Sequence, residues 1–428
     1  IDHYPKGYYL LLFVLIAAVI GTFCAQDFLL FYLFFEFMLL PMFFLIGIWG
    51  GAKREYASIK FFLYTLLGSI LILIVLIGLY LSTRSSLDAN QLVHTFSLIE
   101  MQQSTNIISN SLLDPGRNVE LGGLTLRMWA FLFLLVGFGI KLPMVPFHTW
   151  LPDAHVEAPT PISILLAALL LKIGGYGLLR IIYPIFPDVA LQLSWLVALL
   201  GATSIIYGAL AAMASKDLKR LIAYSSVSHM GFVLLGVASG TAEGAAGAVY
   251  QMVSHGVISS MLFILAGVLY DRTHDRIIGN YSGLSSKMPV YFSFTLIAFF
   301  ASLGLPGFSG FMAEIMVFLG GFRSASANGL LHEGFTIVAT LGLAIGAAYY
   351  LWTLQRMFFG KFDIKGNATG SHLTDATLRE KLMLIPLSIA TLLLGIFPQL
   401  LLTYINPLSD AFVTWLQAGK SLLHLTTP

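Results

Sequence analysis

Eleven long apolar segments follow one another along this 428-residue chain, and they constrain its fold more than any other feature. A helix needs about 20 apolar residues to cross a hydrocarbon core of about 30 Å. Inside that core every backbone polar group must be satisfied within the protein, which a helix achieves by itself. The sequence therefore predicts an all-α integral membrane protein with about eleven transmembrane helices. The segments are residues 7–25, 26–49, 57–82, 126–147, 161–183, 189–213, 219–239, 246–270, 288–322, 335–359 and 380–404.

The composition agrees with this fold class and excludes several functions. The chain is 57% hydrophobic and 10% charged, whereas a soluble domain carries about 25% charged residues. A formal net charge of +2 gives no basis for a nucleic-acid partner. The single cysteine, Cys24, is interpreted as a small buried side chain. The sequence contains neither a Cys/His cluster with ligand spacing nor a Gly-rich phosphate loop. We therefore expect no metal on this chain and any redox cofactors on other chains.

Polar stretches divide the apolar segments. Residues 83–125 are rich in Ser and Asn and predict an extramembrane loop, and residues 360–378 predict a second polar linker. Only Gln26 and Asp27 separate the first two segments, so a tight antiparallel pair is expected. Residues 409–423 could form a short amphipathic helix on the membrane surface. The chain begins at Ile1 without a signal peptide, and we expect that an N-terminal portion precedes it.

Lysine and arginine are distributed unequally between the two predicted sides of the membrane. One side collects fifteen of the 23 basic residues and the other collects six. Basic loops face the cytoplasm in most membrane proteins, so the first side is predicted to be cytoplasmic, or its equivalent in an organelle. That side holds the N-terminal flank and the loops at 50–56, 148–160, 214–218, 271–287 and 360–379.

Four charged residues fall inside apolar segments: Glu36, Lys141, Lys172 and Glu314. A charge at the middle of a membrane helix costs about 2.5–3.5 kcal/mol on insertion scales, and such residues face a bundle interior, a partner or water. A static ion pair, for instance between Glu36 and Lys141, would explain two of them. Four such residues together favour a path for protons.

Two histidines lie in neighbouring apolar segments with polar company. His229 follows Ser225 by four residues and so shares a helix face with it. Gln251, His255 and Ser259 form a second stripe at the same spacing. A lone helical histidine is more often a satisfied core residue. Two of them on polar stripes favour a hydrated path, since an imidazole with an ordinary pKa of about 6.5 accepts and releases protons.

Helix breakers accompany the charges at both ends of this set. Pro143 and Pro146 follow the first buried lysine, and Gly304, Pro306 and Gly307 precede the second glutamate. Proline removes a backbone donor, and irregular backbone within a bilayer is tolerated only where protein or water covers it. Interrupted helices in matching positions of two halves point to an inverted-repeat transporter site.

The order of these features predicts two inverted five-helix repeats, each with an interrupted, charged fourth helix. The first repeat would cover residues 1–183, including the loop at 83–125, and the second residues 184–360. Residues 361–428 would hold the linker, the last transmembrane helix and a tail. No sequence identity between the halves supports the division, which depends on the pattern alone.

Four ordered strings carry a specific resemblance. KLPMVPFHTWLPDAHVEAPT at 141–160, LLKIGGYG at 170–177, KDLKRLIAYSSVSHMG at 216–231 and SLGLPGFSGFMAE at 302–314 resemble the M-subunit family of respiratory complex I, equivalent to mitochondrial subunit 4. The resemblance covers the chain apart from 83–125. That family has fourteen helices, and the eleven segments here resemble its fourth to fourteenth.

The resemblance implies roles for the buried charges. Glu314 matches the M subunit in particular, because paralogous subunits carry a lysine at the corresponding position. The helix-pairing glutamate, the two buried lysines, the two central histidines and the last glutamate of the family correspond to Glu36, Lys141, Lys172, His229, His255 and Glu314.

The implied function is proton translocation by an antiporter-like subunit, coupled to quinone reduction elsewhere in an NADH:quinone or ferredoxin:quinone oxidoreductase. FMN, iron–sulfur clusters and quinone are then expected on partner subunits, and paralogous antiporter-like subunits and lipids as neighbours, in the bacterial inner membrane. Three alternatives are a subunit of a multisubunit sodium/proton antiporter, a relative of membrane-bound hydrogenases, and a scaffold that has lost transport.

A polar group on the cytoplasmic side, formed by His148, Asp153, His155 and Glu157, has two interpretations. It could be a metal or proton-uptake site, or its members could cap and dock a re-entrant turn, which is the commoner use of such residues.

Three geometric expectations follow. Lys172, in an uninterrupted apolar helix, should lie near the bilayer midplane among water and polar groups. Glu36 and Lys141 should approach within salt-bridge or single-water distance. Lys141, Lys172, His229, His255 and Glu314 should form one lateral hydrophilic line.

Overall fold

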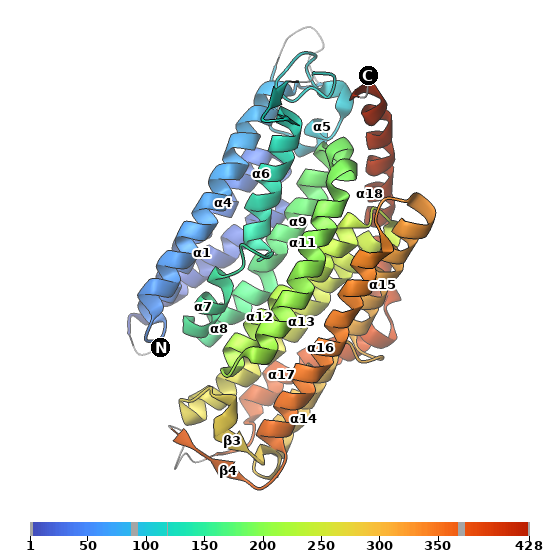
Figure 1. Cartoon of the computed structure of the whole chain (residues 1–428). Helices are drawn as coiled ribbons and strands as arrows, with labels where there is room; N and C mark the ends of the chain where they lie inside the picture. The colour runs from blue at the N-terminus through green and yellow to red at the C-terminus, as the bar shows by residue number, and fades with distance from the viewer. Residues whose placement is uncertain (1–2, 87–92, 118, 367–372, 427–428) are drawn as a thin grey trace.

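The fold is an elongated bundle of helices, described by a computed structural model for residues 3–86, 93–117, 119–366 and 373–426 (Figure 1). The first half holds α1 (Pro5–Cys24), α2 (Phe28–Phe37), α3 (Leu39–Trp49), α4 (Arg54–Ser82), α6 (Leu126–Lys141), α7 (Trp150–Glu157), α8 (Thr160–Leu165), α9 (Leu171–Gly177) and α10 (Tyr183–Ile185). The second half holds α11 (Pro187–Ala214), α12 (Leu218–Ala238), α13 (Ala242–Thr273), α14 (Pro289–Ser302), α15 (Ser309–Arg323), α16 (Glu333–Phe358), α17 (Leu378–Ile396) and α18 (Gln399–Thr426).

All eleven predicted segments are helical, although fewer than eleven satisfy a length criterion for crossing a membrane. Among the described residues, eight helices are long and apolar enough, or nine if α17 and α18, bent by 65° from each other, count as one span. The others fall short because they are interrupted: α6 has 16 residues, and α14 and α15 have 14 and 15. The all-α membrane fold is confirmed, and the count of eleven is not.

The two halves share a local construction at their second helices. Asp27 caps α2 by accepting a hydrogen bond from the backbone N–H of Leu30, and Asp217 caps α12 in the same way through Arg220. Each aspartate also forms an isolated antiparallel bridge, with Ser97 and Ile277 respectively, in the loop after the third helix of its half. This likeness favours the repeat division, which stays a prediction.

The fourth helix of each half is broken where the sequence predicts a break. α6 ends at Lys141, and the irregular stretch before α7 contains Pro143 and a cis peptide bond before Pro146. α14 ends at Ser302, and the chain to α15 passes through Gly304 and Gly307, both with positive φ.

The helix of Lys172 is continuous from Thr160 to Ile185, as expected, but it is not α-helical throughout. Two π turns, at Leu166–Leu170 and Leu178–Ile182, lie between α8, α9 and α10. A π turn holds one residue more than an α turn and frees backbone carbonyls, and such turns often occur at functional sites.

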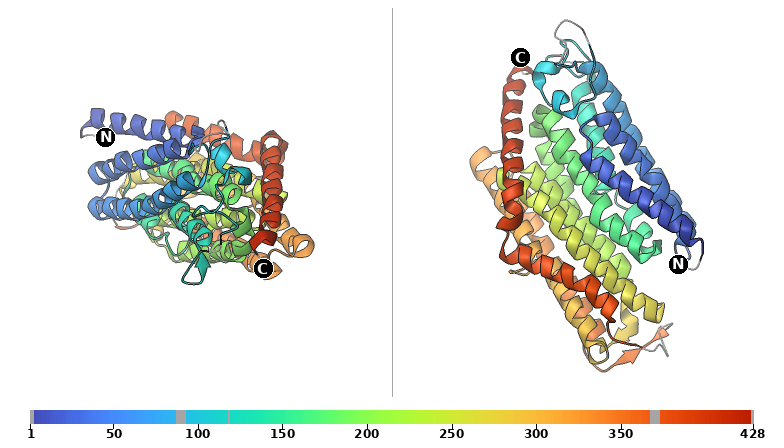
Figure 2. Two further views of the ribbon diagram at one scale, coloured as in Figure 1. Left: turned by 90° about the horizontal axis from the view of Figure 1, so that it is seen from above. Right: turned by 180° about the vertical axis from the view of Figure 1, so that it is seen from behind.

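The first two spans form the predicted antiparallel pair. α1 packs against α2 and α3. The indole N–H of Trp49 donates to the carbonyl of His3, so the start of α1 lies beside the end of α3. Figure 2 shows that α1 and α17 lie on the same face, opposite the viewer of Figure 1.

The basic loops gather at one end of the bundle, as their charge predicts. There β3 (Tyr281–Ser282) pairs antiparallel with β4 (Asp363–Ile364), with Tyr281 opposite Ile364. Short 3₁₀ turns at Ile278–Asn280 and Leu284–Ser286 flank β3. Hydrogen bonds from Arg276 to Val156 and from Gly51 to Glu157 join two further basic-side loops, at 50–56 and 148–160, to the loop that holds β3.

The opposite end carries the predicted extramembrane loop. It contains α5 (Leu98–Met101), a 3₁₀ turn at Ser104–Asn106, and a hairpin of β1 (Glu120–Leu121) and β2 (Leu124–Thr125). The C-terminal helix α18 also reaches this end (Figure 1). It is longer than the amphipathic segment expected at 409–423, because it begins at Gln399 and packs against α11 and α13.

Candidate functional site

Lys172 and His255 are in direct contact at the centre of the bundle. The lysine Nζ lies 2.7 Å from the imidazole Nδ1, and it also donates to the backbone carbonyl of Ala167 in the first π turn. Both side chains are buried, with 6% and 4% of their surface exposed. The π turn thus supplies a backbone acceptor that keeps the ammonium group solvated by protein.

His229 links this pair to Glu314. Its ring centre lies 5.5 Å from that of His255, and its Nδ1 lies 3.8 Å from Oε1 of Glu314. The side-chain amide of Gln251 donates to the same Nδ1 at 3.1 Å, while the amide oxygen has no partner in the described chain. Rotation of this amide by 180° would let its oxygen accept a hydrogen bond from the Nδ1–H of a protonated His229. The arrangement can therefore serve both charge states of the imidazole.

Hydroxyl groups extend the line beyond the histidine. His229 Nε2 lies 3.2 Å from the hydroxyl of Ser302, which lies 2.6 Å from the hydroxyl of Tyr350. Tyr350 donates in turn to Ser225 at 3.1 Å. All of these groups are buried, so every polar atom here depends on its neighbours.

A small cavity adjoins the two histidines. Its space for water-sized spheres is about 10 Å³, which is close to the minimum for one water molecule. Its lining residues are His229, Gln251, Ser254, His255, Ile258, Ala301, Ser302 and Gly310. The polar lining makes this a suitable position for a water that bridges the histidines.

The break in the fourth helix of the second half positions Glu314. Gly304 has φ of +74°, and a Cβ added there would collide with the carboxylate of Glu314. The glycine thus provides both the left-handed backbone and the space for the acid.

Lys141 and Glu36 form a separate group. Lys141 is 1% exposed, its Nζ has no hydrogen-bond partner among the described residues, and it lies 4.7 Å from the ring centre of Phe35. Glu36 interacts with it electrostatically, but no direct ion pair joins them in the described chain. The salt-bridge form of that prediction is wrong, because the aromatic faces of Phe35 and Phe61 occupy positions near the ammonium. The water-bridged form stays a prediction.

The structure thus brings together part of the predicted hydrophilic line. Four of its five side chains, on α9, α13, α12 and α15, lie in one contact series, whereas no described hydrogen bond or ion pair connects Lys141 to them. Their roles in proton transfer stay a prediction. Sequence reasoning missed Ser302, which the structure places against His229, and Tyr350, which it places against Ser302.

The four polar residues at 148–157 have two different kinds of environment in the structure. Asp153 pairs with Lys60 at 2.7 Å and with Arg220 at 3.2 Å, and Glu157 accepts from the backbone of Lys53. These two carboxylates dock the turn, as the commoner interpretation predicts. His148 and His155 are buried without hydrogen-bond partners in the described chain.

A buried ion pair near the opposite surface was also missed. Arg127 donates two hydrogen bonds to Asp188, both of 2.8 Å, and others to the carbonyls of Leu113 and Ile185. These contacts fasten the extramembrane loop and the start of α11 to α6. The charges lie at helix ends, where a sequence suggests solvent contact.

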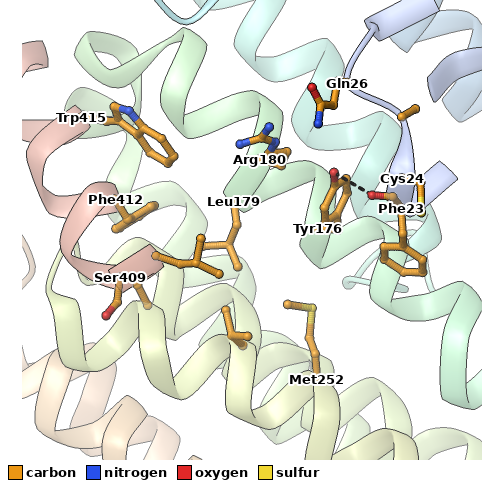
Figure 3. Close-up of a pocket in the computed structure, with 14 residues that line it drawn as sticks. Phe23, Cys24, Gln26, Tyr176, Leu179, Arg180, Met252, Ser409, Phe412 and Trp415 are labelled. Carbon is orange, nitrogen blue, oxygen red and sulfur yellow. Dashed lines mark hydrogen bonds between the residues drawn. The ribbon is translucent and has the colours of Figure 1, made fainter. Parts of the chain in front are cut away.

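A larger, mostly apolar pocket of about 530 Å³ lies apart from the contact series (Figure 3). Tyr176, Arg180, Met252 and Trp415 are among its lining residues. Cys24 also lines it and is exposed, so its interpretation as a buried side chain is wrong, because α1 ends there at the rim of the bundle. No cluster of three or more potential metal ligands occurs among the described residues.

Comparison with known sequences identifies relatives over most of the chain. The profile of the family described as "NADH:quinone oxidoreductase/Mrp antiporter, TM" matches residues 25–340. NADH-quinone oxidoreductase subunit M of Rhodobacter capsulatus is 43% identical over 408 residues, which are 94% of this chain and 74% of that protein. NAD(P)H-quinone oxidoreductase chain 4 1 of Synechococcus elongatus is 41% identical over 421 residues, or 98% and 74%.

Solved structures show the same fold. A chain of respiratory complex I from Thermus thermophilus, solved with bound NADH, matches with a TM-score of 0.81 and 34% identity, covering 96% of this chain and 79% of that one. A chain of the Mrp complex from Dietzia sp. matches with a TM-score of 0.79, 21% identity and the same coverage. At that identity the second likeness concerns the fold alone.

Proposed function

Because the chain belongs to the NADH:quinone oxidoreductase/Mrp antiporter transmembrane family, we propose that its buried contact series carries protons. It is an antiporter-like membrane subunit of a complex I-type NADH-quinone oxidoreductase, like its subunit M relatives. It works beside the other membrane subunits of that complex, in the bacterial inner membrane. The sodium/proton antiporter alternative has less support, because its structural relative is only 21% identical.

The observation that carries the proposal is the 2.7 Å contact between Lys172 and His255, continued through His229 to Glu314. Four ionisable groups on four helices lie within one hydrogen bond or one water of a neighbour. A lysine without a carboxylate in contact can release its proton, and an imidazole can take the proton on one nitrogen and pass it on from the other. Movement of charge at Glu314 would bias that transfer through His229.

Cofactors belong to the same proposal. FMN, iron–sulfur clusters and quinone are expected on partner subunits, so that electron transfer there changes the electrostatics of this subunit. This chain would then contribute proton transfer alone to the oxidoreductase. NADH and ferredoxin both fit as electron donors.

The test uses the intact complex reconstituted in liposomes. Lys172→Met keeps the apolar length of the side chain and removes the titratable amine. The expected result is a fall in proton delivery of about 100-fold, typical of a lost acid–base group, with normal amounts of assembled complex. Replacing sodium by choline should leave wild-type delivery unchanged. Wild-type delivery by Lys172→Met would exclude the lysine from the path, and a requirement for sodium would favour the antiporter alternative.

A further inference from the structure

The mostly apolar pocket of about 530 Å³ lies between the two halves of the bundle and has no part in the proposed path. Its walls come from the end of α1, from α9 and the second π turn, from the first part of α13, and from α18. Pockets that bind small molecules usually have a volume of about 300–1,000 Å³ and a mostly apolar lining. This pocket therefore has the size and the lining of a ligand site.

The pocket begins near the membrane surface that lies opposite the basic loops. Gln26 lines it, and the backbone carbonyl of Gln26 accepts a hydrogen bond from Leu98 in the extramembrane loop. The side-chain amide of Gln102 in the same loop donates to the backbone carbonyl of Arg180. Met252, on the opposite side of the pocket in Figure 3, is ten residues from the start of α13, or about 15 Å along its axis. A ligand that fills the pocket would thus have one end at the surface and the other in the hydrocarbon region.

Arg180 is the only charged side chain among the described residues that line the pocket. It is half-buried, and none of the ion pairs in the described chain includes it. Its interaction with the hydroxyl of Tyr176 leaves the charge uncompensated, because that hydroxyl is neutral. Figure 3 shows Arg180 between Trp415 and Tyr176, on the same side of the pocket as Gln26. A guanidinium group without an acid partner favours an anionic ligand, and its planar donors match a phosphate group.

The rest of the lining suits a hydrocarbon chain. Leu179, Val249 and Met252 form part of the apolar wall that continues from the arginine. Leu179 and Arg180 both belong to the second π turn, so one turn provides an apolar and a charged contact. Trp and Tyr side chains are enriched at the level of lipid headgroups, which agrees with the two aromatic side chains beside the arginine.

These two parts of the lining select the class of ligand. Free phosphate would leave the apolar walls in contact with water, which is unfavourable. A neutral quinone would leave the arginine without an anion. An anionic amphiphile satisfies both the charged end and the apolar wall, and cationic pockets between membrane helices are known sites for lipid headgroups.

We propose that this pocket binds one anionic phospholipid from the leaflet opposite the basic loops. The phosphate accepts hydrogen bonds from Arg180, and one acyl chain lies against Leu179, Val249 and Met252. Because the walls belong to both halves and to α18, the lipid connects the first half to the second at this surface. The site does not depend on proton transfer, so a failure of the proposed function would leave it unaffected.

Cys24 is a reporter for occupation of this site. It is the only cysteine of the chain, it is exposed, and it lines the pocket, so a bound phospholipid would cover its thiol. The experiment uses the intact complex, depleted of lipid in detergent, and adds anionic phosphatidylglycerol, zwitterionic phosphatidylcholine or a neutral quinone in separate samples. The rate at which a maleimide modifies Cys24 is measured by mass spectrometry of the peptide that contains it.

Four variants accompany the wild type. Arg180→Gln removes the charge and keeps a polar side chain, and Arg180→Lys keeps the charge without the planar donors. Lys420→Gln is the matched control, because Lys420 is an exposed cation on α18 that does not line the pocket. Val249→Trp fills the apolar part of the pocket.

Phosphatidylglycerol at about ten times its dissociation constant should slow the modification of Cys24 by about tenfold, since only the empty site exposes the thiol. Phosphatidylcholine at the same concentration should have a much smaller effect. Arg180→Gln should remove the difference between the two lipids, Arg180→Lys should keep part of it, and Lys420→Gln should match the wild type. Val249→Trp should abolish the protection by phosphatidylglycerol.

If Arg180→Gln fails to assemble, Arg180→Lys and Val249→Trp decide. Equal protection by the two lipids in the wild type, or a preference for phosphatidylglycerol that survives in Arg180→Gln, overturns the assignment. Slow modification of Cys24 in the lipid-depleted complex also overturns it, because protein would then fill the pocket. Protection by the quinone in place of phosphatidylglycerol would assign the pocket to a neutral ligand and overturn the proposal as well.

Discussion

Replacing Gly304 by alanine should disconnect Glu314 from the contact series, whereas the same change at Gly307 should not. Both glycines lie in the break between α14 and α15 with positive φ, +74° and +98°. A Cβ at Gly304 would occupy the space of the Glu314 carboxylate, while a Cβ at Gly307 would meet no atom within 4 Å. Comparing the two variants therefore distinguishes the effect of displacing the Glu314 carboxylate from the effect of backbone strain, which both variants share.

The expected magnitude follows from the distance between Glu314 and His229. Left-handed backbone costs an alanine about 1–2 kcal/mol, and both variants carry this loss of stability. At an effective dielectric constant of about 20, a charged pair at 3.8 Å gains about 4 kcal/mol, and a shift of about 1.5 Å removes about 1 kcal/mol. Gly304→Ala should thus weaken the coupling between these two groups by about fivefold to tenfold.

The assay is proton delivery by the reconstituted complex, divided by the amount assembled. We expect Gly304→Ala to deliver protons at least about fivefold more slowly than Gly307→Ala. Thermal unfolding of the two variants controls for the shared backbone strain and should give similar midpoints. Equal delivery by both variants would refute the argument that Gly304 makes room for the acid.

Three other predictions concern separate parts of the chain. Asp188→Asn leaves the buried Arg127 without its counter-charge, so unfolding should become easier by about 3–5 kcal/mol; an unchanged thermal midpoint would contradict this. Glu36→Ala should impair proton delivery because Lys141 loses an acid that acts on it electrostatically, and Glu36→Asp should retain part of the delivery; a fully active alanine variant would remove Glu36 from the mechanism. A hydrogen bond from Thr95 lowers the pKa of Glu100 below its ordinary 4.5. Its contribution to loop stability is therefore present at neutral pH and lost as pH falls through the lowered pKa, which hydrogen exchange of the loop would detect.

The sequence predicts most of the fold because lipid leaves few alternatives. The fold follows from local features: the length of each apolar segment, its Pro and Gly breaks, and the basic residues of each loop. Each of these can be recognised in one segment without knowledge of the others. Interruption is visible as Pro143 or Gly304, but where a helix stops, as α6 does at Lys141, depends on which carbonyls the tertiary structure satisfies. The structure therefore does not confirm the count of eleven spans.

The site is predictable in its charges and unpredictable in its connections. Lys172, His229 and Glu314 stand out because each is costly in an apolar helix. Ser302 does not, since a serine hydroxyl in a helix often bonds to the backbone of the preceding turn. Tyr350 does not, since its ring gives it a largely apolar body that suits such a helix. Whether two side chains come into contact depends on how each helix is rotated about its axis. The boundaries of the apolar segments do not specify that rotation.

The two π turns of the Lys172 span affect how this region will compare among relatives. Each contains one residue beyond the α-helical repeat, so a chain that lacks one turn would be one residue shorter within a membrane helix. An alignment that moves this gap into a loop would match Lys172 with the wrong residue of the relative. Deletion of a single residue at Leu166–Leu170 would turn the preceding part of the helix by about 100° relative to Lys172. A one-residue gap in this π turn therefore indicates that a different face of the helix contacts α13. This change occurs even when the deleted residue has no side-chain function.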